Sequence, residues 1–450
     1  MQGLARWLLR NAPAAALTAL AVSGSGLVSG VAAAQSGPVS PTPAPGTPAL
    51  GNTGAIEQIR QLVACGGTMF AVGTFTSISQ GSQTVTRNNV FSFSQAAPYA
   101  LTSWMPSVNG TVNSIQLTSD CQHAFIGGQF SQVDGSSAHN IAYIRTYNNT
   151  MVQSWAHSAN GQVDTILRTG NNHLLVGGKF TAINGSSKRY YVSLNPGTGK
   201  DDGYLNLNIS GHYVYPGVGV NNTEVYNQQL SPDGGHVLVE GTFTRVESTP
   251  RQQIFMLNLG NHGNLSIWNS AEFNQFCADK HPFYIKSAAW SADMSTVYIA
   301  DTGFAPLGWN NTFPLTGLCD AVAAFPATRV GGLSHDWVNY TGCDSLYSVA
   351  ADSTAVYVGG HERWADNQDA CNQQSATAIP APGMGGFHLN GALITNASGT
   401  AGLYSRDRGL GADDIYRTSA GIWIASDNQG GSNMCGGLGG FAGICFLPYS

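Results

Sequence analysis

Polar side chains suited to ligand binding gather in two runs near the end of the sequence, at 361–369 and 406–414, and an aspartate follows at 427. An arginine can donate paired hydrogen bonds to a carboxylate or to hydroxyl groups, a tryptophan offers a flat face, and carboxylates accept hydrogen bonds. These residue types together predict a binding site for a polar ligand. The candidate ligand-binding residues are His361, Glu362, Arg363, Trp364, Asp366, Arg408, Asp413, Asp414 and Asp427.

A structural role for the same residues is the competing interpretation. Arg363 could pair with Asp413 or Asp414, because ion pairs also form where neighbouring structural units meet. His361 beside Glu362 is a candidate general base, although adjacent residues of a strand face opposite ways. The sequence after residue 34 has no nucleophile elbow, zinc-protease motif, phosphate-binding loop or dinucleotide fingerprint. Whether the protein is an enzyme therefore stays open, the motifs favour binding, and no catalytic residue is assigned.

A second group of carboxylates lies near the beginnings of several short apolar segments. Oxygen ligands of this kind can hold Ca²⁺, so an acidic collar around a channel would leave calcium open as a cofactor. The polar run 366–369 lacks the spacing of a calcium-binding hand. The alternative is a solvated polar rim without metal, and no cofactor is certain. The collar residues are Asp164, Glu224, Asp344, Asp413 and Asp414.

β-Strands are expected to position these groups, because the sequence shows no long apolar stripe of helical period and is rich in Gly, Thr, Asn and Ser. One hairpin of two apolar strands joined by a polar turn recurs seven times, often ending in Gly-Gly. The steps between equivalent positions are 55, 50, 63, 60, 59 and 66 residues. This repetition predicts an all-β, single-domain, seven-bladed β-propeller. The equivalent positions are Gly73, Gly128, Gly178, Gly241, Asp301, Gly360 and Ser426.

Each repeat predicts the same order of strands within a blade. The first strand, as at 163–167, is expected to line a central channel, and the continuously apolar second strand, as at 174–176, to be buried between neighbouring blades. The last strand, 441–447, is the third of its blade, so the outer strand of that blade is missing. We expect residues before Ile56 to supply it and close the ring.

Six of the eight cysteines fall at equivalent positions in pairs of repeats, and the other two flank the corresponding loop of the seventh, so four disulfides are predicted. Eight cysteines have 105 pairings, so agreement with the repeat is informative. No Cys-x-x-Cys occurs, which disfavours zinc. Three of these disulfides would hold the long loops between second and third strands, at 304–318, 361–383 and 427–440, on the same face of the propeller. The predicted pairs are Cys65 with Cys121, Cys277 with Cys319, Cys343 with Cys371, and Cys435 with Cys445.

Composition and the first residues predict the location of the protein. Residues 1–34 have a positive start, a short apolar stretch and a small-residue cleavage site, which is typical of a secretory signal peptide. A Pro-rich linker is expected over 35–52 and the propeller over 53–450. The net charge of −6 and the lack of a basic cluster argue against nucleic-acid binding. Because no later apolar run is long enough to anchor the chain, we expect a secreted, extracellular protein, monomeric unless it joins a secreted complex.

The repeat copies at 126–135 and 176–185 resemble the delta-60 repeat of secreted bacterial propellers, and the segments 357–364, 408–413 and 421–427 are similar to the end of actinobacterial proteins of this kind. The resemblance covers roughly residues 55–450. It implies a propeller with kelch-like Gly-Gly turns, and it implies no particular reaction.

The function expected from these observations is lectin-like recognition of an extracellular glycan or protein through the face that carries the loops of blades five to seven. Long stapled loops on a rigid scaffold are a common way to build a site. One alternative is a secreted hydrolase, lyase or oxidase acting on polysaccharide at the same channel mouth, with Glu362, His361 and a collar aspartate. Another alternative is a structural subunit of a secreted assembly.

Overall fold

The computed structural model describes residues 37–450 except 52, 213–221, 276, 278–283, 304–316, 329, 397, 400–408, 410 and 430–442. These described residues form β-strands, and their one helical segment is the short 3-10 turn Ala271–Asn274. No helix among them is long and apolar enough to cross a membrane. The expectation of an all-β chain is confirmed.

Among the described residues, seven main antiparallel sheets, each of three or four strands, follow one another along the chain. They are β2 (Gln58–Cys65), β3 (Thr68–Thr74) and β6 (Val90–Ser94); β7 (Thr111–Leu117), β8 (His123–Gln129) and β11 (Ile141–Arg145); β12 (Val163–Arg168), β13 (Leu174–Gly178) and β14 (Tyr191–Leu194); β16 (Val225–Leu230), β17 (His236–Gly241), β20 (Ile254–Leu259) and β21 (Gly263–Leu265); β22 (Tyr284–Trp290), β23 (Thr296–Thr302), β24 (Ala321–Pro326) and β25 (Trp337–Tyr340); β26 (Leu346–Ala351), β27 (Ala355–Gly360) and β30 (Met384–His388); β31 (Asp414–Thr418), β32 (Gly421–Ala425) and β33 (Ile444–Pro448).

Four smaller sheets lie in the connections between these strands. They are β1 (Ala49–Leu50) with β4 (Ser77–Gln80) and β5 (Gln83–Thr86); β9 (Gln132–Val133) with β10 (Ser136–Ser137); β15 (Ile209–Ser210) with β18 (Arg245–Val246) and β19 (Thr249–Pro250); and β28 (Trp364–Ala365) with β29 (Ile379–Pro380).

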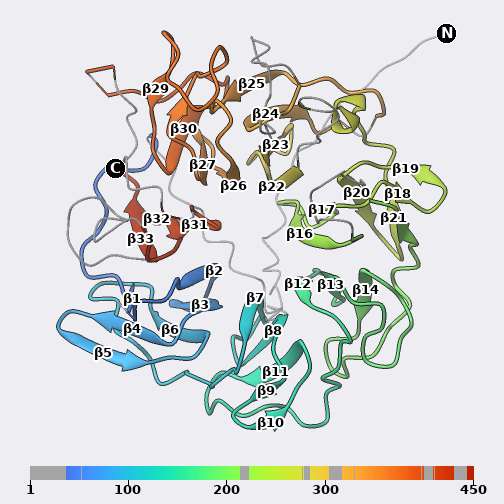
Figure 1. Cartoon of the computed structure of the whole chain (residues 1–450). Coiled ribbons are helices and arrows are strands. Elements are labelled where there is room, and N and C mark those ends of the chain that lie inside the picture. The colour runs from blue at the N-terminus through green and yellow to red at the C-terminus, as the bar shows by residue number, and fades with distance from the viewer. Residues whose placement is uncertain are drawn as a thin grey trace, which may run out of the picture. The chain divides into compact units, whose positions relative to one another are not determined.

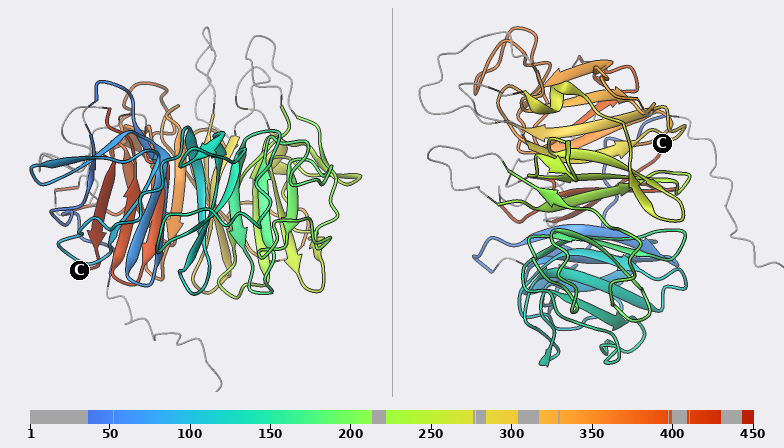
Figure 2. Two further views of the ribbon diagram at one scale, coloured as in Figure 1. Left: turned by 90° about the horizontal axis from the view of Figure 1, so that it is seen from below. Right: turned by 90° about the vertical axis from the view of Figure 1, so that its right-hand side faces the viewer.

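The first strands of the seven main sheets lie nearest to one another. β2 contacts β7, β7 contacts β12, and the same relation continues through β16, β22, β26 and β31. β31 in turn contacts β2, so the last sheet adjoins the first. Figure 1 shows the sheets arranged round a centre, and Figure 2 shows strands of successive sheets side by side in the side views. Radially arranged antiparallel sheets of this size are the architecture of a β-propeller.

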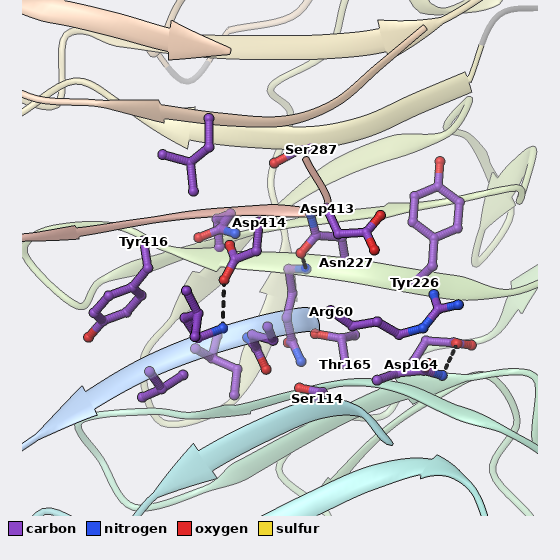
Figure 3. A pocket seen from close by; sticks show the side chains of 18 of the residues that line it. Arg60, Ser114, Asp164, Thr165, Tyr226, Asn227, Ser287, Asp413, Asp414 and Tyr416 are labelled. Atoms are coloured by element: carbon purple, nitrogen blue, oxygen red, sulfur yellow. Dashed lines mark hydrogen bonds between the residues drawn. The ribbon is translucent and has the colours of Figure 1, made fainter. Parts of the chain in front are cut away.

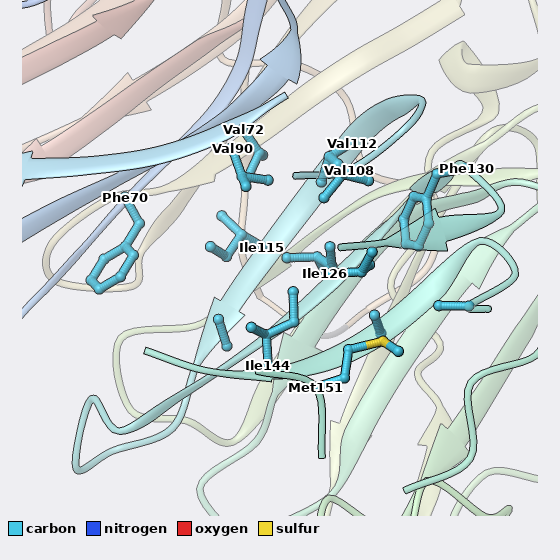
Figure 4. Close-up of a cluster of buried hydrophobic side chains, with 14 of the residues drawn as sticks. Phe70, Val72, Val90, Val108, Val112, Ile115, Ile126, Phe130, Ile144 and Met151 are labelled. Atoms are coloured by element: carbon cyan, nitrogen blue, oxygen red, sulfur yellow. The ribbon is translucent and has the colours of Figure 1, made fainter. Parts of the chain in front are cut away.

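Apolar side chains fill the spaces between neighbouring sheets. Val72 and Val90 of the first main sheet pack with Val112 and Ile126 of the second, and all four are fully buried (Figure 4). The second strands are buried along almost their whole length, as in β13 and β27. The prediction that the second strand lies between neighbouring sheets, with both faces covered, is thus consistent with its burial.

The outer edge of the last main sheet is covered by the beginning of the described chain. Val39 forms an antiparallel bridge with Tyr449, and the backbone N–H groups of Ser40 and Ala44 donate to the carbonyls of Pro448 and Phe446 at 2.7 and 2.8 Å. Residues before Ile56 thus lie along the outer edge of β33, as expected, through one isolated bridge and these hydrogen bonds. Several residues of the segment expected to be a linker are accordingly buried, Val39 and Leu50 among them.

Three disulfides join Cys65 to Cys121, Cys277 to Cys319 and Cys343 to Cys371, with Cα–Cα distances of 5.7, 5.6 and 5.0 Å. These three predicted pairs are confirmed. The fourth predicted pair includes Cys435, which lies outside the described residues. The bond between Cys65 and Cys121 links the first two main sheets, whereas the other two each tie a loop to the segment that precedes a first strand.

Candidate functional site

Six of the seven first strands contain a β-bulge at the same position. In β2, for example, Ile59 pairs with Gly73 and Gln61 pairs with Val72, so Arg60 has no partner across the ladder. An extra residue of this kind bends the strand and turns its side chain in a new direction. The bulged residues are Arg60, Asn113, Asp164, Tyr226, Lys286 and Tyr347.

Glycines opposite the bulges explain why the repeat ends in Gly-Gly. A Cβ atom on Gly73 would lie 2.0 Å from the carbonyl oxygen of Gln58, and one on Gly128 would lie 2.1 Å from that of Thr111. Similar contacts, at 2.1–2.3 Å, would arise at Gly178, Gly241 and Gly360. The second strand therefore needs a residue without a side chain at the point where the bulged backbone approaches it most closely.

The bulged side chains line a single cavity of about 890 Å³ at the centre of the seven sheets. Asp413, which directly precedes β31, lines the same cavity and supplies the contribution of the last sheet. We call these seven residues the bulge ring. Figure 3 shows Arg60, Asp164, Tyr226 and Asp413 converging on the cavity. In chain order the ring runs Arg60, Asn113, Asp164, Tyr226, Lys286, Tyr347 and Asp413.

Positive and negative side chains alternate around the bulge ring, and a neutral side chain separates each charged residue from the next one in chain order. Two cations, Arg60 and Lys286, are interleaved with two carboxylates, Asp164 and Asp413. Electrostatic attraction links Arg60 to both carboxylates and Lys286 to both as well. The two positive and two negative charges of the ring therefore balance, and each charge is attracted by opposite ones.

The two carboxylate oxygens of Asp164 differ in their hydrogen bonding. Its Oδ1 accepts hydrogen bonds from Asn113 Nδ2, at 3.0 Å, and from Gln162 Nε2. Its Oδ2 is buried and has no hydrogen-bond partner among the described residues. Burial raises the pKa of Asp164 to about 6, against the opposing effect of the Gln162 hydrogen bond.

Asp413 has a similar unpartnered oxygen on the opposite part of the ring. Its Oδ2 is buried without a hydrogen-bond partner in the described part of the chain. Burial raises the pKa of Asp413 to about 7, although Arg60 and Lys286 lower it and the neighbouring Asp427 and Asp414 raise it. Both carboxylates thus line the cavity and have one buried oxygen for which the described residues supply no donor.

The cations of the cavity are held by aromatic and acidic neighbours. Lys286 Nζ lies 5.0 Å from the centre of the Tyr226 ring, a cation–π contact, and the Tyr226 hydroxyl donates to the carbonyl of Ile285. Burial lowers the pKa of Lys286, and the nearby carboxylates oppose that effect. Lys179 Nζ, at the cavity wall, forms an ion pair with Glu224 Oε2 at 3.0 Å.

A second row of polar side chains, one position after the ring residue, ties several first strands to the next. Gln61 Oε1 accepts from the Ile115 N–H at 2.6 Å, Ser114 Oγ from the Ile166 N–H at 3.0 Å, and Ser287 Oγ from the Val349 N–H at 3.4 Å. Asp414 Oδ2 accepts from the Leu62 N–H at 2.9 Å, which joins the last first strand to the first (Figure 3). These bonds satisfy the innermost edges of the sheets.

The collar predicted from the sequence is present in part. Asp164, Glu224, Asp413 and Asp414 line the cavity, whereas Asp344 does not and was wrongly placed there. Within the described residues no three His, Cys, Asp or Glu side chains are arranged to hold a metal ion. The carboxylates of the cavity are interleaved with the cations Arg60 and Lys286.

Arg363 pairs with Asp344 and not with Asp413 or Asp414, so the predicted partner was wrong. Its Nε and Nη2 donate to the two Asp344 oxygens at 2.7 and 2.9 Å, and the Asp344 side chain is almost fully buried. The guanidinium also lies 4.3 Å from the centre of the Trp364 ring. The partner lies within the same repeat because the loop after β27 folds back over the segment that precedes β26.

The remaining candidate residues are spread around this loop and the last sheet. His361 and Glu362 begin the loop, and the Glu362 side chain is buried away from the cavity. Asp366 exchanges hydrogen bonds with Asn339, through its side chain and its backbone N–H. Asp427 is fully buried and accepts from the N–H groups of Gly411 and Gln429. Arg408 lies outside the described residues.

Most bulge-ring residues were absent from the sequence prediction, which selected dense polar runs. Arg60, Tyr226, Lys286 and Tyr347 stand alone among apolar and neutral neighbours, so no local cluster marks them. A signal did exist in the repeat: each of them is separated from its opposing glycine or Asp301 by a similar number of residues across the first hairpin. Aligning first strands on that position would have revealed the ring.

Comparisons with known proteins bear on the fold alone. A scan against protein-family models and a search of curated proteins both found no match. Solved structures with some likeness include the WD40 repeats of RRP9, with a TM-score of 0.46, 11% identity and coverage of 91% of this chain and 99% of that chain. Another is U3-55K, with a TM-score of 0.44, 11% identity and coverage of 90% and 99%. The strand pairing described above, and not this distant likeness, supports the architecture.

Proposed function

We propose that the protein is an extracellular recognition module, a closed seven-bladed propeller that binds its ligand at the mouth of the central cavity. The observation that carries this proposal is the bulge ring, because six first strands and the residue before the seventh each contribute one side chain to the same cavity. Precisely placed polar groups converging in a cavity of a few hundred cubic ångströms are the usual form of a ligand site.

Secretion is supported by the cysteines. Three disulfides are formed, and such bonds persist in oxidising surroundings outside the cytosol. The expected signal peptide, residues 1–34, lies outside the described part of the chain. Export would place the cavity in contact with extracellular glycans and proteins, the two ligand classes that we consider.

The loop between β27 and β30 forms part of the proposed binding face. It begins beside Tyr347 of the bulge ring, because His361 N donates to the carbonyl of Ser345 at 2.7 Å. The disulfide between Cys343 and Cys371 and the Arg363–Asp344 ion pair hold it rigidly. The residues of this loop are not among those that line the cavity, so its contact with a ligand at the mouth is part of the proposal.

Recognition is favoured over turnover by the placement of the residues offered for catalysis. His361 and Glu362 are not among the residues that line the cavity, and Glu362 is buried. No general base therefore comes from His361 or Glu362, although the collar aspartates Asp164 and Asp413, also part of the enzyme alternative, do line the cavity.

The test is a binding screen with the purified mature chain against glycan and extracellular-protein arrays. Binding should fall for Arg60→Ala, which removes a side chain of the bulge ring, and stay unchanged for Lys200→Ala, an exposed cation outside the cavity. Equal binding by the two variants would contradict the cavity as the site, and the absence of any ligand would contradict recognition itself.

A further inference from the structure

The two unpartnered oxygens of the bulge ring indicate which groups a ligand must bring. Asp164 Oδ2 and Asp413 Oδ2 are both buried and lack a donor among the described residues. A buried acceptor without a donor is costly, because it has lost its water and gained nothing in return. A ligand that carries two donors at separated positions would satisfy both oxygens at once.

The cations of the ring indicate that the same ligand must also accept hydrogen bonds. Arg60 presents a guanidinium with five possible donors, and Lys286 an ammonium with three. Both side chains line the cavity with the two carboxylates. The ligand therefore needs donors and acceptors distributed over its whole surface.

We propose that the cavity binds an uncharged saccharide residue, whose hydroxyl groups donate to Asp164 and Asp413 and accept from Arg60 and Lys286. This inference rests on the proposed function and names the ligand class of the same site. A hydroxyl group is both a donor and an acceptor, so a polyhydroxylated ring matches an alternating set of charges from any side.

The balance of charge disfavours ions as ligands. Each cation of the ring is compensated by carboxylates that attract it, and Lys179 is likewise paired with Glu224. An anionic ligand would have to displace these attractions on one half of the ring and would meet carboxylates on the other. A neutral ligand avoids that electrostatic cost.

Tyrosine rings provide apolar surface beside these polar groups. Tyr226 and Tyr347 stand between the charged residues of the ring, and both line the cavity. A sugar ring has apolar faces as well as polar edges, and an aromatic side chain with a polar tip suits that combination. The cavity of about 890 Å³ lies within the range of small-ligand sites.

Affinity should depend on pH because the ligand donates to carboxylates. Asp413 faces Arg60 and Lys286, which favour its charged form, and Asp414 and Asp427, which oppose it. Asp164 faces Arg60 and Lys179, which favour its charged form, and Glu224, which opposes it. The pKa values of about 7 and about 6 mean that both become charged as the pH rises through neutrality. Saccharide affinity is therefore expected to increase from pH 5 to pH 8.

The experiment is calorimetric titration of the full mature chain with neutral mono- and oligosaccharides, in low and high salt. We expect binding that varies little with salt, strengthens from pH 5 to 8, and falls by about tenfold or more in Asp164→Asn and Asp413→Asn. The matched control is Asp336→Asn, an exposed carboxylate outside the cavity, which should bind as the parent does. Circular dichroism verifies that each variant is folded.

The outcomes separate this inference from the proposed function. If arrays show a peptide or protein ligand that depends on Arg60 while every neutral saccharide fails, the saccharide assignment is overturned and recognition at the cavity stands. Binding of zwitterionic amino compounds that weakens steeply with salt would also overturn it. If no ligand of any class binds, both the function and the ligand class fail together.

Discussion

Asp414 illustrates how a residue suited to ligand binding can serve the fold. Its Oδ2 accepts the Leu62 N–H at 2.9 Å and so connects β31 to β2, the strands at the two ends of the series. Burial raises the pKa of Asp414 to about 6, although the hydrogen bond from Leu62 opposes the shift. We therefore assign Asp414 to the connection between sheets and leave ligand contact to its neighbour Asp413.

Removing the Asp414 carboxylate should destabilise the protein. Asp414→Ala leaves the buried Leu62 N–H without its acceptor, and the expected loss is about 1–3 kcal/mol in the free energy of unfolding. Asp414→Asn keeps an acceptor oxygen and should lose less. Urea denaturation followed by tryptophan fluorescence measures both, and equal stability of the alanine variant and the parent would contradict the assignment.

Buried carboxylates predict that stability decreases as the pH rises. Burial raises the pKa of Glu240 to about 8 and that of Asp320 to about 7. A carboxyl group with a raised pKa in the folded state contributes fully below its ordinary pKa and loses that contribution as the pH rises through the folded value. The melting temperature should accordingly fall between pH 5 and pH 8.

The matched variant for this prediction is Glu240→Gln. Neither oxygen of Glu240 has a hydrogen-bond partner among the described residues, so the amide replaces a group that is neutral at low pH. Its melting temperature should depend less on pH than that of the parent in the same interval. A parent whose stability rises over this range would show that the buried carboxylates are not dominant.

At the scale of the strand, the first hairpin of each bulged repeat directs one side chain toward the central cavity. The bulge supplies the direction, and the facing glycine supplies the space. The fifth repeat departs from this, because Asp301 stands where the other five bulged repeats have glycine. There Asp301 Oδ1 accepts the Ala321 N–H at 3.1 Å, and burial with Asp320 nearby raises the pKa of Asp301.

The importance of the facing glycine can be measured at Gly128. A Cβ there would lie 2.1 Å from the Thr111 carbonyl oxygen and 2.8 Å from the Val112 Cα, so Gly128→Ala must displace backbone. The expected cost is about 1–3 kcal/mol or more. Gly170→Ala is the control, since nothing lies within 4 Å of its added Cβ, and it should change stability by about 0.5 kcal/mol at most. Similar melting curves for both variants would refute the explanation.

At the scale of the whole molecule, the beginning and the end of the described chain share one sheet. The hydrogen bonds from Ser40 and Ala44 to β33 are joined by Thr47 Oγ1, which donates to the carbonyl of Ile444 at 3.1 Å. Val39 N donates to the Tyr357 hydroxyl at 3.1 Å, so the segment also reaches the preceding sheet. These contacts connect residues more than 300 positions apart.

Deleting residues 35–52 should therefore lower the melting temperature, because β33 loses its outer neighbour and exposes a sheet edge. Leu50→Ala tests the same segment without deletion, since Leu50 is buried in the core with Ile59 and Ile444, and is expected to cost about 2–5 kcal/mol. Ile56→Ala, at an exposed position beside the segment, is the control. An unchanged melting temperature after deletion would contradict a closing role.

The repeat, the strand order and three cysteine pairs could be derived from the sequence, because each depends on local regularity. Apolar strands, polar turns and glycines recur within every repeat. Cys65 and Cys121 take equivalent positions in neighbouring repeats, whereas the other two pairs join the same two positions within one repeat. The dense polar run at 361–369 was recognised for the same reason, although most of it stabilises its own loop. Arg363 is the example: its partner, Asp344, precedes the strand of the same repeat.

What the sequence alone determined was therefore a set of repeated β-hairpins and the cysteines that join them. Only the tertiary structure decided that Arg60, Asp164, Lys286 and Asp413 line one cavity, since they come from repeats far apart along the chain. Arg60, Asp164 and Lys286 are each turned by a bulge that no polar cluster in the sequence marks. Convergence on an axis is a property of neighbouring sheets, and no single segment contains it.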